Sequence, residues 1–158
     1  EQVVLDLADL LRSALASLER ITLGEEIELT RRYLAIEQLR MGERLRVDWQ
    51  LDDGLPLDAP LPALLLQPLV ENAIHHGIQL LPEGGQLTIR IEKQLRALRF
   101  VITNPRPPAG GQRYIQGQRL AQDNIRQRLL LVYGAASQLE ITETLDSYRV
   151  AFAVPLSD

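Results

Sequence analysis

The sequence contains no cysteine among its 158 residues. Disulfide frameworks, thiolate metal sites and cysteine nucleophiles are therefore excluded, and a reducing compartment is compatible with the composition. With 46% hydrophobic and 24% charged residues and a mean hydropathy of -0.07, the chain has the composition of an ordinary soluble globular protein. Its length suits one domain, or a compact domain with a helical extension, whose core is held by apolar burial alone.

An excess of positive charge is also missing, since 17 Lys and Arg stand against 21 Asp and Glu and the pI is near 5.3. Without a basic field, nucleic acid is not an expected partner. No apolar run approaches the roughly eighteen residues of a membrane span, and the N-terminus lacks the basic-then-apolar order of a signal peptide. Because the chain starts at Glu1 inside a helical pattern, we expect it to be a fragment of a longer protein.

Two periodicities alternate along the chain. Apolar residues at helical spacing predict helices over residues 3–20, 22–45, 59–78 and 119–134. Alternation with a period of two predicts strands over residues 45–51, 86–94, 98–104, 137–145 and 148–156. The second helix has a possible Thr22 cap with Glu25 three residues on, and Pro68 should kink the third helix or mark its working start.

The order of these elements predicts the fold class. The first two helices suggest a helical hairpin. The strands arrive mostly as hairpins separated by helices, which predicts an α+β sandwich with one mixed sheet and helices on a single face.

One stretch of the third helix, LLLQPLVENAIHHGIQ at residues 64–79, holds both histidines of the chain. On a helical wheel the apolar residues share one arc, and the opposite arc holds Glu71, Asn72, His75 and His76. Such a polar face is either a surface stripe on a helix packed against the sheet or a binding site. Spacing alone leaves both interpretations open.

The segment PLVENAIHHG resembles the N box of the ATP-binding domain in LytS-type sensor histidine kinases, whose usual form is Leu-Val-Glu-Asn-Ala-Ile-(Lys/His)-His-Gly. The stretch DNIRQRLLLVYG resembles the helix that follows the ATP lid in that family. The stretch EIELTRRYLAIEQLRMGERL resembles the segment that precedes the domain, with its core at Tyr33, Leu34, Ile36, Glu37 and Arg40. The three motifs stand in the family's order and cover most of the chain.

The resemblance implies a fold and a division of the chain. The fold would be a two-layer α/β sandwich of the Bergerat ATP-binding type with an N-terminal helical segment. Residues 1–44 would form the C-terminal part of the dimerisation and phosphotransfer helices, and residues 45–158 the ATP-binding domain.

The resemblance also implies a reaction and partners. The γ-phosphoryl group of Mg²⁺-bound ATP would pass to a histidine upstream of this fragment, for relay to an aspartate of a LytTR-type response regulator. The parent protein would be a homodimer through its N-terminal helices. It would be a bacterial inner-membrane sensor with this portion in the cytoplasm, and it would touch the membrane only through upstream segments that this chain lacks.

Within the N box, the resemblance makes Asn72 the Mg²⁺ ligand, in agreement with the preference of this hard cation for oxygen donors. His75 takes the family's Lys/His position and would reach a phosphate. Glu71 would orient metal-bound water or polarise an attacking group, and a solvated or salt-bridged role is the alternative. His76 would line the cofactor site, although we favour a packing role for it.

Two glycine-rich boxes depart from the family pattern. Asn104 stands where most histidine kinases have the Asp of Asp-x-Gly-x-Gly, and its amide can still accept a hydrogen bond from the adenine amino group. The Pro- and Gly-rich residues 105–111 fit a mobile ATP lid or an ordinary surface loop. In the second box Gly117 is kept but Arg119 replaces the second glycine, so it would either hinder the phosphates or bind them.

The helix after the lid keeps Asn124 and Arg128 of the family pattern. The resemblance implies that both bind the nucleotide, whereas Arg126 is expected to be solvated. No histidine precedes His75 in the sequence. This chain therefore cannot autophosphorylate at the family's usual site by itself.

Two other kinds of site fit the sequence less well. The histidines could bind Zn²⁺, but adjacent side chains on a helix diverge by about 100° and the spacing places no third ligand. A Ser-His-Asp hydrolase lacks its Gly-x-Ser-x-Gly elbow. Two alternatives stay open: a degenerate, non-catalytic module on the same fold that binds a nucleotide or a partner, and a helical interaction protein that dimerises through residues 4–39.

Overall fold

The computed structural model describes residues 20–107 and 112–156, without the side chains of residues 112–121 and 136. Its centre is a five-stranded mixed sheet in the order β2-β4-β5-β7-β6. The strands are β2 (Leu45–Leu51), β4 (Gly85–Lys93), β5 (Ala97–Pro105), β6 (Glu140–Glu143) and β7 (Ser147–Pro155). β2 runs parallel to β4, and the other neighbours pair antiparallel. The five strands predicted from alternation are therefore confirmed.

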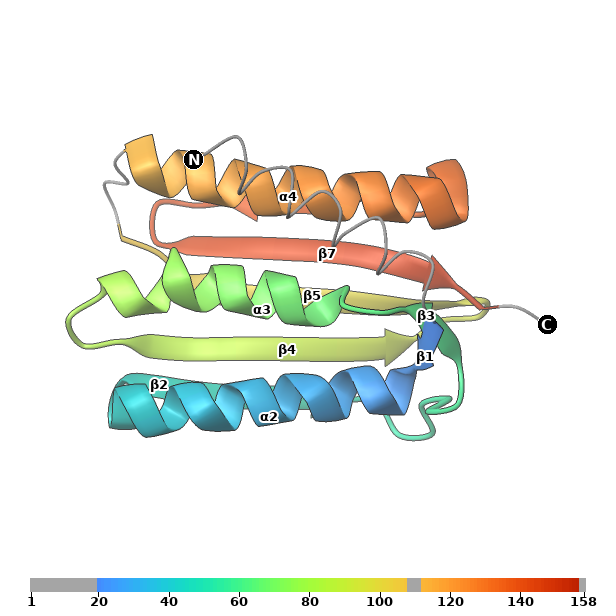
Figure 1. The fold of residues 1–158 in the computed structure, drawn as a ribbon, viewed down its shortest axis with the longest axis horizontal. Coiled ribbons are helices and arrows are strands. Elements are labelled where there is room, and N and C mark those ends of the chain that lie inside the picture. Colours follow the sequence, from blue (N-terminus) through green and yellow to red (C-terminus); the bar gives the residue numbers. More distant parts are fainter. Residues whose placement is uncertain (1–19, 108–111, 157–158) are drawn as a thin grey trace.

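Three α-helices of the described chain lie side by side in one layer over one face of this sheet (Figure 1). They are α2 (Leu23–Met41), α3 (Leu66–His75) and α4 (Gln112–Tyr133). α3 is the middle helix and packs against both α2 and α4. The predicted α+β sandwich, with one mixed sheet and helices on a single face, is confirmed.

Short elements complete the described chain. They are the 3-10 helices η1 (Gly42–Arg44), η2 (Ile78–Leu80) and η3 (Gly134–Ala136), and a two-stranded antiparallel sheet of β1 (Arg20–Thr22) and β3 (Pro60–Pro62). The small sheet was not predicted, because three residues are too few to show an alternation. The helix predicted over residues 3–20, and with it the helical hairpin, lies outside the described residues. None of the described helices has the length and apolar character that a membrane crossing requires.

The core lies between the sheet and the helix layer. In β4, Leu87 and Ile91 are fully buried and belong to the core cluster, whereas Arg90 between them is exposed on the opposite face. Because that face is polar, the helices cover only one side of the sheet. The rings of Phe100 and Phe152 stack 4.9 Å apart across the β5–β7 pair.

α2 has the predicted N-terminal cap. The Thr22 hydroxyl accepts a hydrogen bond from the Glu25 N–H at 3.1 Å, and the Glu25 carboxylate accepts one from the Thr22 N–H at 3.3 Å. Leu23 and Leu34 of this helix belong to the same core cluster as the sheet. α2 is thus a helix of the sandwich layer although it precedes the domain boundary predicted after residue 44, and that boundary stays a prediction.

α3 begins at Leu66, and Pro68 lies in its first turn, where the helical ladder requires no backbone N–H. Pro68 therefore marks the start of the helix and does not kink it. α4 begins at Gln112, earlier than the helix predicted over residues 119–134. Apolar spacing missed this extension because residues 112–118 are mostly polar.

Candidate functional site

The polar cluster of α3 is divided between two sides of the helix. Glu71 and His75 lie on the side of α2, where the Tyr33 hydroxyl is 3.5 Å from His75 Nε2. Burial raises the pKa of Tyr33 above its usual 10.0, and the carboxylates of Glu37 and Glu71 raise it further. The single polar arc expected from the helical wheel is therefore corrected, because this half of it contributes to the contact between α2 and α3.

Asn72 and His76 share another flank of α3, about 100° around the helix from Glu71 and His75, because residues four apart lie above one another and successive residues differ by about 100°. Asn72 is only 5% exposed, and its Oδ1 is buried without a hydrogen-bond partner in the described part of the chain. His76 is half-buried, and burial lowers the pKa of its imidazole, as does the neighbouring His75. A ligand that reaches Asn72 would therefore meet His76 on the same flank.

The second predicted amide, Asn104, lies near the C-terminal end of β5 and not in a loop. Its Nδ2 donates to the Pro105 carbonyl at 2.8 Å, while its Oδ1 is buried and unpartnered among the described residues. Gly77 packs directly against it, since a Cβ added at Gly77 would lie 2.3 Å from Asn104 Nδ2. The end of α3 and the end of β5 therefore meet beside His76.

Two buried amide oxygens without partners are unusual, because buried acceptors are almost always hydrogen-bonded. Asn104 Oδ1 can accept from an amino group, and Asn72 Oδ1 suits Mg²⁺, which prefers oxygen ligands. Where side chains are described, no three His, Asp or Glu residues gather in a way that could hold a metal ion. A magnesium ion at Asn72 would therefore take most of its ligands from a bound phosphate and from water.

α4 contributes a polar contact near Asn104 that the sequence did not predict. Tyr148 of β7 pairs with Asn104 in register, and its hydroxyl accepts a hydrogen bond from Gln122 Nε2. Both Tyr148 and Gln122 are buried. The available signal was the position of Gln122, three residues before Ile125 on the apolar face of the helix. Asn124, two residues further on, is half-buried.

The second glycine box falls inside a helix. Gly117 and Arg119 lie within α4, although the placement of the Arg119 side chain is outside what the structure describes. Backbone N–H groups inside a helix donate to preceding carbonyls, so they do not cradle phosphates as a glycine loop does. Of the predicted lid, residues 108–111 are outside the described residues.

Arg128 differs most from its expected place. It was predicted to approach the nucleotide, but it is 4% exposed and donates hydrogen bonds to the carbonyls of Ala63 and Leu64. Its guanidinium is thus bound within the protein, on the segment that leads into α3. Arg126, which was predicted to be solvated, is exposed and lies 3.8 Å from the Asp123 carboxylate.

Comparisons with known proteins agree with this arrangement. A family model described as histidine kinase matches residues 1–45. The sensor protein LytS of Oceanobacillus iheyensis is 33% identical over 167 aligned residues, which cover 97% of this chain and 28% of that protein. The chain belongs to the LytS-like histidine kinases. The family predicted from the three motifs is therefore confirmed, for a chain that spans little more than a quarter of that relative.

Solved structures share the fold of this LytS-like chain. The catalytic domain of histidine kinase ThkA has a TM-score of 0.62 at 17% identity, over 87% of this chain and 95% of that domain. Full-length ShkA in complex with AMPPNP has a TM-score of 0.67 at 18% identity, over 99% of this chain and 35% of ShkA. At such identities the likeness establishes the fold alone.

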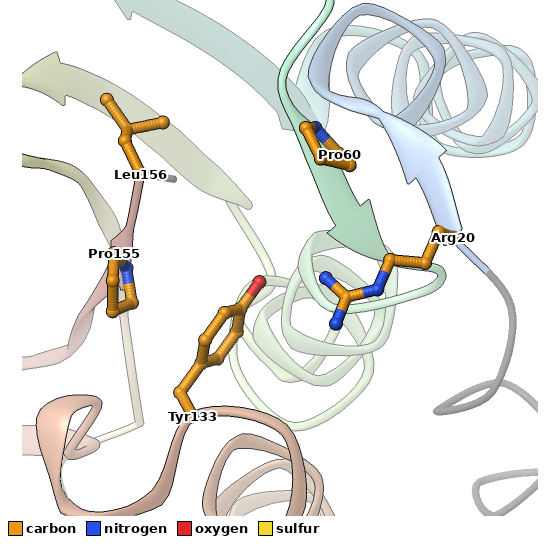
Figure 2. Close-up of a pocket in the computed structure, with 5 residues that line it drawn as sticks. All are labelled: Arg20, Pro60, Tyr133, Pro155 and Leu156. Atoms are coloured by element: carbon orange, nitrogen blue, oxygen red, sulfur yellow. The ribbon is translucent and has the colours of Figure 1, made fainter. Parts of the chain in front are cut away.

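The LytS-like chain also has a pocket of about 410 Å³ (Figure 2). Its lining residues are Arg20, Pro60, Tyr133, Pro155 and Leu156. The Tyr133 hydroxyl points toward the Arg20 guanidinium, and burial raises the pKa of Tyr133 while Arg20 lowers it. Pro155 pairs with the first residue of β5, whereas Asn104 is the last but one, so this pocket is separate from the two amides.

Proposed function

We propose that this chain is the ATP-binding catalytic region of a two-component sensor histidine kinase, with Mg²⁺-bound ATP held between α3, the end of β5 and α4. One observation carries the proposal: the side-chain oxygens of Asn72 and Asn104 are buried without partners in the described structure. The shared fold supports it, because ShkA was solved in complex with the ATP analogue AMPPNP.

In this proposal Asn72 Oδ1 is a Mg²⁺ ligand and Asn104 Oδ1 accepts a hydrogen bond from the adenine amino group. His76 shares the flank of Asn72 and would be a phosphate ligand. The exposed His75 would join it only with its ring turned away from Tyr33, because its Nε2 lies 3.5 Å from that hydroxyl on the α2 side. Glu71 accepts a hydrogen bond from Gln67 at 3.1 Å and would orient a water on the metal. Asn124 on α4 completes the proposed nucleotide contacts.

The proposed reaction begins when a histidine on an upstream segment attacks the γ-phosphorus. A P–N bond forms, the bond to the β,γ-bridging oxygen breaks to release ADP, and the imidazole proton passes to water. The phosphoryl group then moves to an aspartate of a response regulator, which we propose to be of the LytTR type. This chain would contribute positioning and charge neutralisation rather than a covalent intermediate.

The test is calorimetric titration of the chain with Mg·ATP, for the wild type and for Asn72→Ala. Because the variant loses a metal ligand, we expect its affinity for Mg·ATP to fall by at least about tenfold, equivalent to about 1.4 kcal/mol. Removal of Mg²⁺ with a chelator should bring the two proteins to the same affinity. Gln86→Ala is the matched control, since it removes an exposed amide from β4.

Two results would overturn the proposal. One is a wild-type chain that binds no nucleotide at millimolar Mg·ATP. The other is an Asn72→Ala variant with unchanged affinity and unchanged dependence on Mg²⁺, which would remove the metal-ligand role.

A second candidate is a degenerate module on the same fold, which binds a nucleotide or a partner without phosphoryl transfer. The helical conformation of residues 117 and 119 favours it, because the phosphate-cradling loop is then missing. Transfer of labelled phosphate from ATP in the full-length parent separates the two functions. Binding without any transfer would favour the degenerate module.

We propose that the parent protein is a homodimeric membrane sensor whose N-terminal helices form the dimer. The family match over residues 1–45 supports this assembly. Light scattering of the chain with and without residues 1–19 tests it, and this deletion spares α2, whose apolar residues belong to the core. A dimer that survives the deletion would place the interface elsewhere.

A further inference from the structure

The start of α3 is held by charged side chains from both neighbouring helices. Glu26 of α2 accepts hydrogen bonds from the backbone N–H groups of Leu64 at 3.2 Å and Leu66 at 2.7 Å. Arg128 of α4 donates hydrogen bonds to the carbonyls of Ala63 and Leu64. Residues 63–66 are therefore held by hydrogen bonds to a carboxylate of α2 on one side and a guanidinium of α4 on the other. We call this arrangement the Leu64 clamp.

Both charged groups of the Leu64 clamp are buried. Glu26 is 1% exposed and Arg128 is 4% exposed. Burial lowers the pKa of the Arg128 guanidinium and the charge of Glu26 raises it, yet an arginine stays protonated in proteins. A buried charge is tolerated only where a partner and hydrogen bonds compensate for its lost hydration. Each group therefore depends on the segment and on the other group.

The backbone of Leu64 adopts a conformation that the surrounding structure has to hold in place. Its φ is 60°, in the left-handed region that side chains other than glycine rarely occupy. Such a conformation persists only when its surroundings over-determine it. Here the chain leaves β3 and turns into α3, so the dihedral angles of this residue set the direction in which the helix starts.

We propose that Glu26 and Arg128 are positioning residues of the nucleotide site, which act by fixing the start and the rotation of α3. Asn72 lies six residues after Leu66 on the same helix, so a rotation at Leu66 is carried to its side chain. The inference rests on the proposed function at Asn72. A further consequence is that a displacement of α2 or of α4 reaches the nucleotide helix through the same four residues.

The experiment compares Glu26→Gln and Arg128→Lys with matched exposed controls on the same helices, Glu28→Gln and Arg126→Lys. Two quantities are measured in each protein: the affinity for Mg·ATP and the amide hydrogen exchange of α3 relative to β4 and β5. Each clamp variant should bind Mg·ATP at least about tenfold more weakly. Its exchange should accelerate in α3 by a similar factor and stay unchanged in β4 and β5, because the sheet does not depend on the clamp.

The double variant provides a further check. Because both side chains hold one segment, Glu26→Gln combined with Arg128→Lys should weaken binding little beyond either single change. Exchange that accelerates equally in α3, β4 and β5, or that does not change in α3, would overturn the proposal, since the residues would then have only a general structural role.

The outcomes also separate this inference from the proposed function. If the wild-type chain binds no nucleotide, the proposed function fails, and the exchange data still decide whether the clamp fixes α3. If the wild type binds Mg·ATP and both clamp variants bind it equally well, the positioning role is rejected while the nucleotide site stands.

Discussion

At the scale of single residues, the burial of His76 makes the free energy of unfolding depend on pH. Burial lowers the pKa of its imidazole below 6.5, and His75 lowers it further. Between the folded-state pKa and 6.5 the unfolded chain binds more protons, so the free energy of unfolding rises with pH across this interval. We expect the contribution of His76 to be complete above pH 6.5 and to be lost as the pH falls below it.

Urea denaturation at a series of pH values measures this effect. The variant His76→Gln should flatten the dependence of the unfolding free energy on pH below 6.5. The control is His75→Gln, which removes the exposed neighbour and should leave most of the slope in place. An unchanged slope in His76→Gln would show that its imidazole has the same pKa in both states.

Gly77 permits the close approach of α3 and β5. A Cβ at this position would lie 2.3 Å from Asn104 Nδ2 and 2.6 Å from the Ala73 carbonyl oxygen. We expect Gly77→Ala to lower the free energy of unfolding by about 1–3 kcal/mol through overpacking, and to weaken Mg·ATP binding by displacing Asn104. Denaturation and calorimetry measure the two effects.

Gly54→Ala is the matched control for this substitution. Gly54 has a φ of 72° and no neighbour within 4 Å of an added Cβ, so alanine there introduces backbone strain without a clash. It should cost about 1–2 kcal/mol and leave nucleotide binding unchanged. Equal binding by both variants would contradict the role of Gly77.

The sequence motifs predicted the chemical character of the site residues better than the direction in which their side chains point. The N box located Asn72, and the structure buries its unpartnered oxygen on the flank of α3 that His76 shares. Arg128 occupies the expected position in the family motif, yet it binds the segment before α3 because a motif does not specify which way a long side chain points. Glu26 was overlooked, although a charged residue between core positions such as Leu23 and Ile27 was a usable signal.

At the scale of elements, the N-terminal cap of α2 contributes to the stability of the fold. The reciprocal hydrogen bonds of Thr22 and Glu25 satisfy backbone donors in the turn that carries Glu26. We expect Thr22→Ala to lower the free energy of unfolding by about 1 kcal/mol, within the usual range for N-caps. Thermal denaturation measures the loss, and Thr22→Ser, which keeps the hydroxyl, should retain most of the stability. Equal losses in both variants would contradict the cap.

The positions of the strands were easier to predict than the way in which the strands pair. Alternation of buried and exposed residues located β4 and β7, because one face of each strand packs on the helices. The parallel pairing of β2 with β4 could not be predicted, since an alternation contains no information about the neighbouring strand. The small sheet of β1 and β3 was missed because each strand has only three residues.

At the scale of the whole molecule, nucleotide binding should stabilise the fold. A ligand that binds only the folded state, at a hundred times its Kd, adds about 2.7 kcal/mol. For a chain of this size that corresponds to a rise in Tm of roughly 5–10 °C. Calorimetric scans with Mg·ATP, with ATP and a chelator, and with Mg²⁺ alone measure it. A rise of the same size without Mg²⁺ would contradict a metal-dependent site.

The parallel pair also links the edge strand to the helix of the site. Leu45 of β2 pairs with Gly85 of β4, and α3 lies in the intervening connection as the crossover helix of a β-α-β unit. Among the described strands, β2 pairs only with β4, the strand into which the connection through α3 leads. Because two parallel neighbours need such a crossover connection, we expect a local opening that detaches α3 from the sheet to weaken the pairing of β2 as well. The edge strand and the helix of Asn72 are therefore coupled in stability.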